Sequence, residues 1–240
     1  MRALDFLILT YLQPGMMPVL AFRQPARATS GRSCARLLPS TPFQSFRQPA
    51  KRTMETFVPY IAKDRRFDEL RFDFLIADLV GQSWYDGSPK QFMPERGWCR
   101  DHILPGMVVV DCGAHHGMMT VLFALWTGLT GKVLAYEAIP ANREVIEKNV
   151  RLNGLGNVII RSFGVSDRNG KVCLLTNTSN SSPGGTEMFD VVTLDADLAD
   201  QRVDFLKFDV EGSELDALTG AHYWSRAIRV GRANVSSTGA

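Results

Sequence analysis

The apolar and polar positions between residues 107 and 220 fall into two alternating patterns. An apolar run without polar alternation over residues 107–112 predicts a strand that is buried on both faces, and further strands are predicted over residues 132–136, 157–162 and 203–210. Between these strands, the sequence predicts helices over residues 117–129, 140–154 and 212–220. Strands and helices therefore alternate. This predicts an α/β fold with a doubly wound, mostly parallel, Rossmann-like sheet.

The helix expected after residue 139 has signals at both ends. Pro140 suits the first turn of a helix, where its missing N–H would have no partner anyway, and Gly154 suits the position that ends one. Its apolar residues fall on one side: Val145, Ile146, Val150 and Leu152. Residues 171–175 predict a short additional strand, and residues 176–186 predict a polar loop.

The sequence before residue 105 is less regular. Partial alternation over residues 67–76 predicts a strand or hairpin, residues 83–89 predict a turn, and residues 95–104 predict a short helix. We therefore expect an N-terminal hairpin and helix extension over residues 54–104, followed by the main domain over residues 105–240.

Residues 1–53 differ in composition from the rest of the chain. They hold eight Lys or Arg residues against one Asp, which is a net charge of +7. Because the whole chain carries +2, the other 187 residues carry −5. Prolines interrupt the apolar stretches, and no run reaches the ~20 residues that a membrane-spanning helix needs. Such sequence is typical of a disordered basic tail, an organelle transit peptide or upstream sequence from a wrong start. We expect it to lie outside the fold.

Charge and cysteine content narrow the class of protein. A body with a charge of −5 has no electrostatic reason to bind nucleic acid, whose affinity depends on neutralising phosphates. The four cysteines, at positions 34, 99, 112 and 173, form no CxxC pair, which favours buried thiols over disulfides or a zinc site. We expect a cytoplasmic protein, unless residues 1–53 direct it to an organelle. The oligomeric state is left open.

Acidic residues lie at the ends of three predicted strands: Asp111, Glu137 and Asp209. In doubly wound sheets, ligands bind where the carboxyl ends of the strands meet the turns. Glu137 lies 24 residues after Gly113, a position from which an acid can accept both ribose hydroxyls of an adenosine. A metal is not expected at His115 and His116, because adjacent side chains diverge and no third ligand has suitable spacing.

The charge of this first turn distinguishes two adenosine ligands. NAD requires a G-x-G-x-x-G turn, in which pyrophosphate rests on bare helix N–H groups. Here the pattern is D-C-G-A-H-H-G, from Asp111 to Gly117, with an added acid and one fewer glycine. An acid at that place repels pyrophosphate and suits a cationic ligand, and S-adenosylmethionine carries an ammonium, a sulfonium and no phosphate. The sequence therefore favours the methyl donor over the hydride carrier.

Five blocks in natural order resemble the FkbM family of S-adenosylmethionine-dependent methyltransferases: VVVDCGAHHG, AYEAIPANREVIEKNV, VRLNGLGNV, GVSDRNGKVCLL and FLKFDVEGSELDALTGA. The resemblance covers about residues 105–221. It implies the class I methyltransferase fold and transfer of a methyl group, usually to a hydroxyl of a sugar, glycolipid or natural product.

The resemblance also implies residue roles. Asp111, Gly113 and Gly117 would form the donor loop, and Glu137 would hold the ribose, with Asn142 near the adenosine. Gly164 and Val165 stand where the adenine edge lies, but the acid often found there is missing, so backbone groups or Asp167 must serve. Three candidates for the base that activates the acceptor hydroxyl are Asp209, Glu211 and His115, with the two acids favoured.

Several of these residues also have purely structural interpretations. Lys207 can simply cover a strand end, and Glu214 can be a solvated helix residue. Trp84, Tyr85 and Trp98 can roof the acceptor site or pack the N-terminal hairpin, and the second interpretation is favoured.

The last twenty residues depart from the family pattern. A fifth central strand is expected there, yet residues 226–230 place two arginines in it and a polar tail follows. This predicts a domain truncated at its C-terminus. It leaves two alternatives to a working O-methyltransferase: a donor-binding but inactive or unstable fragment, and an NAD-dependent oxidoreductase.

Overall fold

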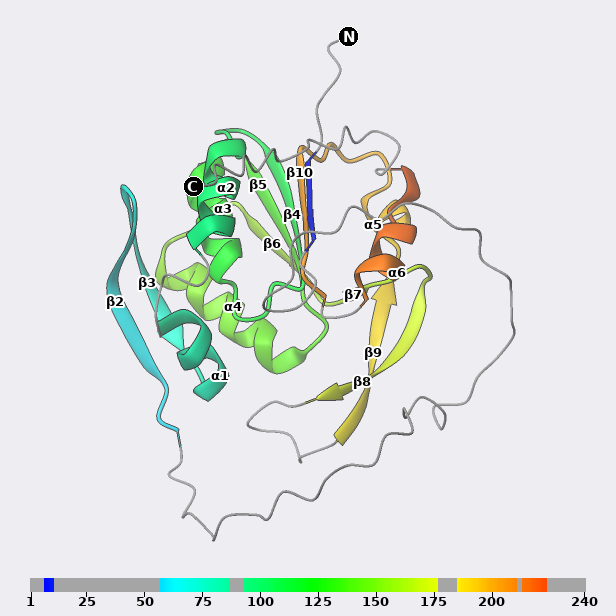
Figure 1. The fold of residues 1–240 in the computed structure, drawn as a ribbon, viewed down its shortest axis with the longest axis horizontal. Coiled ribbons are helices and arrows are strands. Elements are labelled where there is room, and N and C mark those ends of the chain that lie inside the picture. The colour runs from blue at the N-terminus through cyan, green and yellow to red at the C-terminus, as the bar shows by residue number, and fades with distance from the viewer. Residues whose placement is uncertain (1–6, 11–56, 87–92, 177–184, 211–212, 224–240) are drawn as a thin grey trace, which may run out of the picture.

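A parallel five-stranded sheet forms the centre of the molecule (Figure 1). The structure is a computed structural model that describes residues 7–10, 57–86, 93–176, 185–210 and 213–223. The strands, in spatial order, are β1 (Leu7–Thr10), β10 (Phe205–Phe208), β4 (Val108–Cys112), β5 (Lys132–Tyr136) and β6 (Val158–Arg161). Each neighbouring pair is parallel. The prediction of a doubly wound, mostly parallel α/β sheet is confirmed, and the four predicted strands are β4, β5, β6 and β10.

The edge strand β1 departs from the expectation that residues 1–53 lie outside the fold. Leu7 to Thr10 pair in register with Phe205 to Phe208 of β10. An unpaired edge on β10 would leave a row of backbone N–H and C=O groups open, and the apolar tetrapeptide LILT can pair with it. The fifth strand expected over residues 226–230 lies outside the described residues.

Helices cover both faces of this sheet. On one face lie α2 (Met93–His102), α3 (Met118–Thr127) and α4 (Pro140–Leu152), and on the other lie α5 (Leu194–Leu198) and α6 (Glu214–Thr219) (Figure 1). As predicted, Pro140 occupies the first position of α4, and Gly154 follows the helix with φ +61°. The helix α5 was not predicted, because five residues carry too little periodicity.

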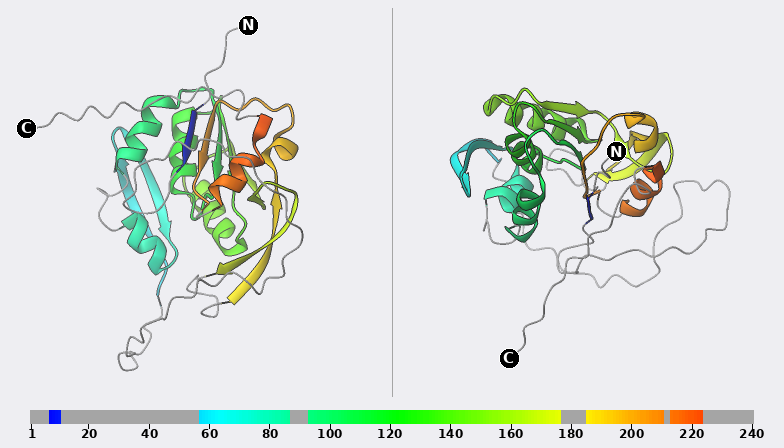
Figure 2. Two further views of the ribbon diagram at one scale, coloured as in Figure 1. Left: turned by 45° about the vertical axis from the view of Figure 1, so that its right-hand side comes forward. Right: turned by 90° about the horizontal axis from the view of Figure 1, so that it is seen from above.

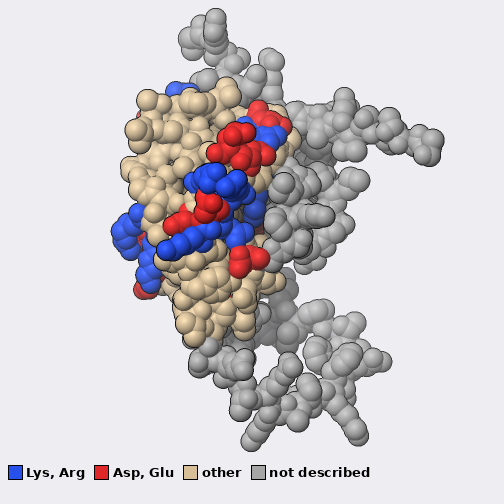
Figure 3. Space-filling view, turned by 90° about the vertical axis from the view of Figure 1, so that its left-hand side faces the viewer, with Lys and Arg blue, Asp and Glu red and all other residues tan. Residues whose placement is uncertain are grey.

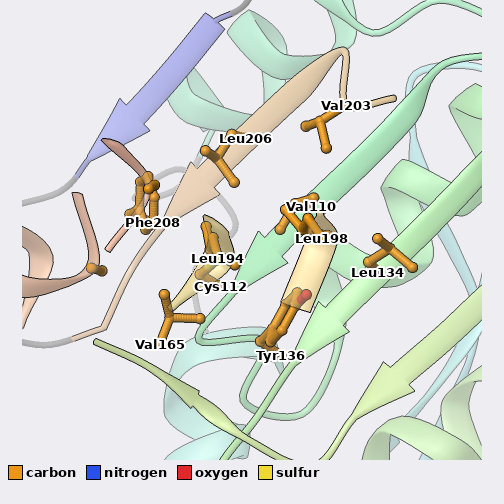
Figure 4. Close-up of a cluster of buried hydrophobic side chains, with 12 residues drawn as sticks. Val110, Cys112, Leu134, Tyr136, Val165, Leu194, Leu198, Val203, Leu206 and Phe208 are labelled. Carbon is orange, nitrogen blue, oxygen red and sulfur yellow. The ribbon is translucent and has the colours of Figure 1, made fainter. Parts of the chain in front are cut away.

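The two faces of the central strands pack into separate cores. Val110, Leu134 and Leu206 project from β4, β5 and β10 towards Leu194 and Leu198 of α5 (Figure 4). On the opposite face, apolar side chains of the same strands pack against α2 and α3: Val109, Val133 and Phe205 with Cys99, Phe123 and Ala124. Burial on both faces explains why these strands lack polar alternation in the sequence.

A second, smaller sheet extends the domain beside α6. It consists of β7 (Gly164–Val165), β9 (Gly185–Val192) and β8 (Gly170–Thr176), and β8 is the additional strand predicted over residues 171–175. The strand β9 was missed, although Phe189 and Val191 are buried and alternate with exposed Met188 and Asp190. Four alternating residues after a polar loop are a weak signal.

The N-terminal extension packs outside α3 and α4 (Figure 2). The strands β2 (Tyr60–Phe67) and β3 (Leu70–Ile76) form the predicted antiparallel hairpin, whose apolar face lies on α3: Phe67, Phe72, Phe74 and Ile76 pack against Met118, Val121 and Leu122. One short helical turn, α1 (Leu79–Gly81), leads into a single π-helical turn, η1 (Gln82–Asp86). The turn expected from residue 83 is therefore helical as far as residue 86, and the remainder lies outside the described residues.

Charged side chains of both signs intermix on the outer face of this extension (Figure 3). Arg71 pairs with Asp64 at 3.0 Å within the hairpin, and Arg100 of α2 pairs with Asp68 at the hairpin tip and with Asp101. The Arg100–Asp68 pair joins the hairpin to α2. Within the described ranges, none of the helices has both the length and the apolar character of a membrane span.

Candidate functional site

The three acids predicted at strand ends lie at one edge of the central sheet. Asp111 belongs to β4, Glu137 directly follows β5, and Asp209 directly follows β10. The three strands are adjacent and parallel, so their carboxyl ends share that edge. The backbone N–H of Asp209 donates to the carbonyl of Cys112 at 3.0 Å, which continues the β10–β4 pairing as far as the site.

The carboxylate of Asp111 is completely buried and has two partners. The Thr120 hydroxyl, one turn into α3, donates to it at 2.7 Å, and Nζ of Lys207 lies 3.4 Å from its other oxygen. The same Nζ lies 3.4 Å from a carboxylate oxygen of Asp209. Lys207 is therefore more than the cover of a strand end, because it bridges the acids of two strands. Thr120 was missed by sequence analysis, although a threonine inside an apolar helix is a signal for such a bond.

Glu137 is buried with both of its carboxylate oxygens engaged. One oxygen accepts the backbone N–H of His115 at 2.8 Å, and the other accepts that of Ile139 at 2.9 Å. Burial raises the pKa of this carboxyl above its usual value, while the two backbone N–H groups and the Asn142 side chain act in the opposite direction. With these three donors in place, the carboxylate keeps lone-pair capacity for a further donor.

The loop between β4 and α3, residues 113–117, requires its two glycines. A Cβ on Gly113 would lie 1.9 Å from the carbonyl oxygen of Asp209, and its φ is +77°. A Cβ on Gly117, at φ +84°, would lie 3.2 Å from Ile146 of α4. The first glycine therefore lets the loop approach the end of β10, and the second lets it pack under α4.

His115 lies in this loop with φ +51°, a left-handed conformation that non-glycine residues rarely adopt. Its Nδ1 is 2.7 Å from the Tyr85 hydroxyl, and its ring stacks on that of His116 at a centroid distance of 4.0 Å. Burial and the neighbouring His116 lower the pKa of His115 to about 3, so the imidazole is neutral near pH 7. Because Tyr85 occupies Nδ1, this nitrogen is not free to take up the proton of an alcohol.

His116 and Asn142 are two further buried side chains at this edge of the sheet. His116 is buried, and its Nε2 lies 3.7 Å from a carboxylate oxygen of Asp78. The side chain of Asn142 is also buried and hydrogen-bonds both Glu137 and His116. The position expected near the adenosine is thus connected directly to the acid expected at the ribose.

Gly164 and Val165 form the short strand β7, beside the turn that follows β5. A Cβ on Gly164 would lie 3.5 Å from Cβ of Ala138, the residue after Glu137. Val165 is buried in the core under α5 and α6, so only its backbone can face a ligand. Asp167 accepts from Ser166 at 3.2 Å and pairs with Arg168.

Four further residues were singled out in the sequence: Glu211, Glu214, Trp84 and Tyr85. Glu211 lies outside the described residues. Glu214 is buried in the first turn of α6 and is not the solvated residue of the structural interpretation. Tyr85 and Trp84 were expected to pack the hairpin. Tyr85 packs on Phe74 of β3, but its hydroxyl reaches His115, so it belongs to both the hairpin and the site.

Among the described residues, no cluster of three or more His, Cys, Asp or Glu side chains is arranged to hold a metal ion.

A family model described as the methyltransferase FkbM domain matches residues 111–237, just over half of the 240 residues. Among curated proteins, no significant match to this sequence is found.

Three solved structures illustrate the structural similarity. A methyltransferase FkbM from Methylobacillus flagellatus KT is 22% identical, with 63% of this chain and 42% of that chain covered and a TM-score of 0.38. A SAM-dependent methyltransferase from Aquifex aeolicus is 23% identical, with 34% and 44% covered and a TM-score of 0.30. TYW2 from P. horikoshii, in complex with MeSAdo, is 19% identical, with 42% and 38% covered and a TM-score of 0.32. The chain thus spans less than half the length of each structure.

Proposed function

The chain belongs to the FkbM family of methyltransferases, and we propose that it transfers the methyl group of S-adenosylmethionine to a hydroxyl of a sugar, glycolipid or natural-product acceptor. The family assignment and the parallel α/β sheet both support a methyltransferase that uses S-adenosylmethionine. The identity of the donor in this chain, the oxygen acceptor and the residue roles are parts of the proposal.

The observation that carries the proposal is the charge at the carboxyl edge of the sheet. Asp111 and Asp209 share the single ammonium of Lys207, which leaves one net negative formal charge at the ends of β4 and β10. S-adenosylmethionine carries one net positive charge, from its sulfonium and ammonium against its carboxylate. A phosphate-bearing dinucleotide would bring two negative charges to the same edge.

The ribose end of the donor suits Glu137 and its neighbours. The buried Glu137 carboxylate is held by two backbone N–H groups and Asn142, so its direction is set before any ligand arrives. Its remaining lone-pair capacity can accept a ribose hydroxyl. Gly164 lies beside Ala138, so an adenine edge held next to Glu137 would meet the backbone of β7.

S-adenosylmethionine, when bound, supplies an electrophilic methyl group on its sulfonium. The task of the protein is to orient the acceptor hydroxyl in line with that methyl and to take up the hydroxyl proton. Asp209 is the base that we propose: its side chain is 45% exposed at the end of β10, whereas Asp111 is completely buried. Glu211 remains a second candidate on sequence grounds. The neutral His115, engaged with Tyr85, fits a positioning role better.

Two alternatives carry different expectations. The family assignment argues against an NAD-dependent oxidoreductase. A donor-binding but inactive protein would bind S-adenosylhomocysteine and transfer no methyl group.

The experiment that tests the proposal is methyl transfer from S-adenosyl-[methyl-³H]methionine to a panel of hydroxyl acceptors, with product analysis for a new methyl ether. We expect label in an acid- and base-stable ether, and a loss of roughly 10²–10⁴-fold in kcat for Asp209→Asn at saturating donor concentration. Asp190→Asn, at an exposed position of β9, is the matched control. Label on nitrogen or carbon would contradict O-methylation, and donor binding without transfer to any acceptor would favour the inactive protein.

A further inference from the structure

Tyr85 brings a phenol into the site from outside the region that the family model matches, residues 111–237. Burial raises the pKa of its hydroxyl above the usual range, and the acids at the sheet edge raise it further, against the opposing effect of Lys207. The charged side chains of Asp111, Glu137 and Asp209 are therefore close enough to act on this hydroxyl, and it stays protonated. It is available as a hydrogen-bond donor at any physiological pH.

The backbone of Tyr85 is clamped by the hairpin. Arg65 of β2 donates to the carbonyl of Tyr85, and it also pairs with the carboxylate of Asp86. The Tyr60 hydroxyl donates to the other oxygen of Asp86 at 2.6 Å, and Gln82 donates to the Tyr60 hydroxyl at 3.2 Å. Two side chains of β2, Arg65 and Tyr60, thus hold the five-residue π-helical turn η1, a rare geometry in proteins.

The ring of Tyr85 is fixed on both sides. It meets Phe74 of β3 edge-on at a centroid distance of 5.3 Å, and Trp84 stands perpendicular to it at 6.3 Å. Phe74 is itself completely buried between the hairpin and α3. The hydrogen bonds that hold η1 and the packing of the ring together fix the direction of the hydroxyl, which points to His115.

His115 needs such support. Its left-handed backbone is sparsely populated by non-glycine residues, and such a conformation persists only when surrounding contacts determine it. Two polar contacts and one stacked ring do so here: Tyr85 at Nδ1, Glu137 at the backbone N–H, and the ring of His116. The Tyr85 hydroxyl and the Glu137 carboxylate are therefore connected through one strained residue.

We propose that Tyr85 is a positioning residue for the methyl donor: its hydroxyl donates to Nδ1 of His115, fixes the tautomer with hydrogen on Nε2, and holds the loop in the conformation in which the His115 N–H orients Glu137. This inference rests on the proposed function, because Glu137 is its binding group for the ribose. It makes the hairpin a part of the donor site, since the hairpin sets the position of Tyr85.

Isothermal titration of S-adenosylhomocysteine into the full chain tests the coupling. Tyr85→Phe keeps the ring and its packing on Phe74 and removes only the donor, and we expect Kd to rise about three- to tenfold. Asp86→Asn, which weakens the clamp and leaves Tyr85 in place, should raise Kd in the same direction. Tyr223→Phe removes the same oxygen from an exposed side chain and is the matched control.

A spectroscopic signature separates positioning from general destabilisation. In protein labelled with ¹⁵N-histidine, long-range ¹H–¹⁵N spectra of the wild type should show His115 as a single tautomer with hydrogen on Nε2. The signals are assigned by their loss in His115→Gln. In Tyr85→Phe we expect a mixture of tautomers, and in Tyr223→Phe the wild-type pattern.

The outcomes separate a failure of this inference from a failure of the proposed function. If the wild type binds S-adenosylhomocysteine and Tyr85→Phe binds it equally well, the positioning role is wrong while the proposed function stands. An unchanged His115 tautomer in Tyr85→Phe also overturns the inference. If folded wild-type protein binds no S-adenosylhomocysteine, the proposed function has failed, and the donor role of Tyr85 fails with it.

Discussion

Lys207 and Asp111 face each other in register across the adjacent strands β10 and β4, with Nζ 3.4 Å from a carboxylate oxygen and both side chains buried. A buried pair of this kind contributes little net stability as a pair, because desolvation offsets the attraction. Removing one partner is different, because it leaves an uncompensated charge in the core. The pair therefore sets the arrangement of charges at the mouth of the sheet.

Lys207→Met should destabilise the protein by about 3–5 kcal/mol, since Asp111 then remains buried without its cation. The free energy of unfolding from urea titration measures this. The double variant Lys207→Met/Asp111→Asn should recover part of the loss. Lys132→Met, on the exposed first residue of β5, should change stability by no more than about 0.5 kcal/mol. A Lys207→Met protein as stable as the wild type would mean that the pair is not buried as described.

Asn149 of α4 connects the hairpin to the main domain. It accepts the backbone N–H of Leu75 in β3 at 2.7 Å and donates to the carbonyl of His116 at 2.9 Å. Asn149→Ala leaves both backbone groups without this partner and should cost about 1–3 kcal/mol for each group that stays unsatisfied. Thermal unfolding compares it with Glu147→Ala on the exposed face of the same helix. Equal melting temperatures for the two variants would contradict the connection.

The neutral His115 makes stability depend on pH below neutrality. Its pKa is lowered to about 3 in the folded protein, so the unfolded chain binds more protons than the folded one between about pH 6.5 and 3. This contribution is fully present above pH 6.5 and is lost as the pH falls, by up to about 1.4 kcal/mol per unit. His115→Gln should flatten the dependence of the unfolding free energy on pH over that range. An unaltered slope in the variant would show that folding does not lower the pKa of His115.

Much of this architecture follows from local sequence. Unalternating apolar runs identify the parallel strands, and an acid at the end of each adjacent strand places Asp111, Glu137 and Asp209 at one edge, because parallel strands end together. Pro140 and Gly154 delimit α4 for local steric reasons. These features depend on residues near one another in the chain.

What sequence analysis missed depends on packing between distant segments. Tyr85 meets His115 across 30 positions, and Lys207 meets Asp111 across 96, so no local pattern reveals either contact. The pairing of Leu7–Thr10 with β10 joins segments that lie still further apart. Short elements such as α5 and the half-buried strand β9 carry too few periodic positions to stand out.

The most direct test of the central claim is calorimetric titration of S-adenosylhomocysteine into the full chain, with NADH as the control ligand and Glu137→Ala as the variant. The account predicts that S-adenosylhomocysteine binds, that NADH does not, and that Glu137→Ala weakens binding by about ten- to a hundredfold, because bonds to a buried carboxylate are lost. Glu147→Ala, on the exposed side of α4, should bind as the wild type does. Binding of NADH in place of S-adenosylhomocysteine, or equal binding by Glu137→Ala, would contradict it.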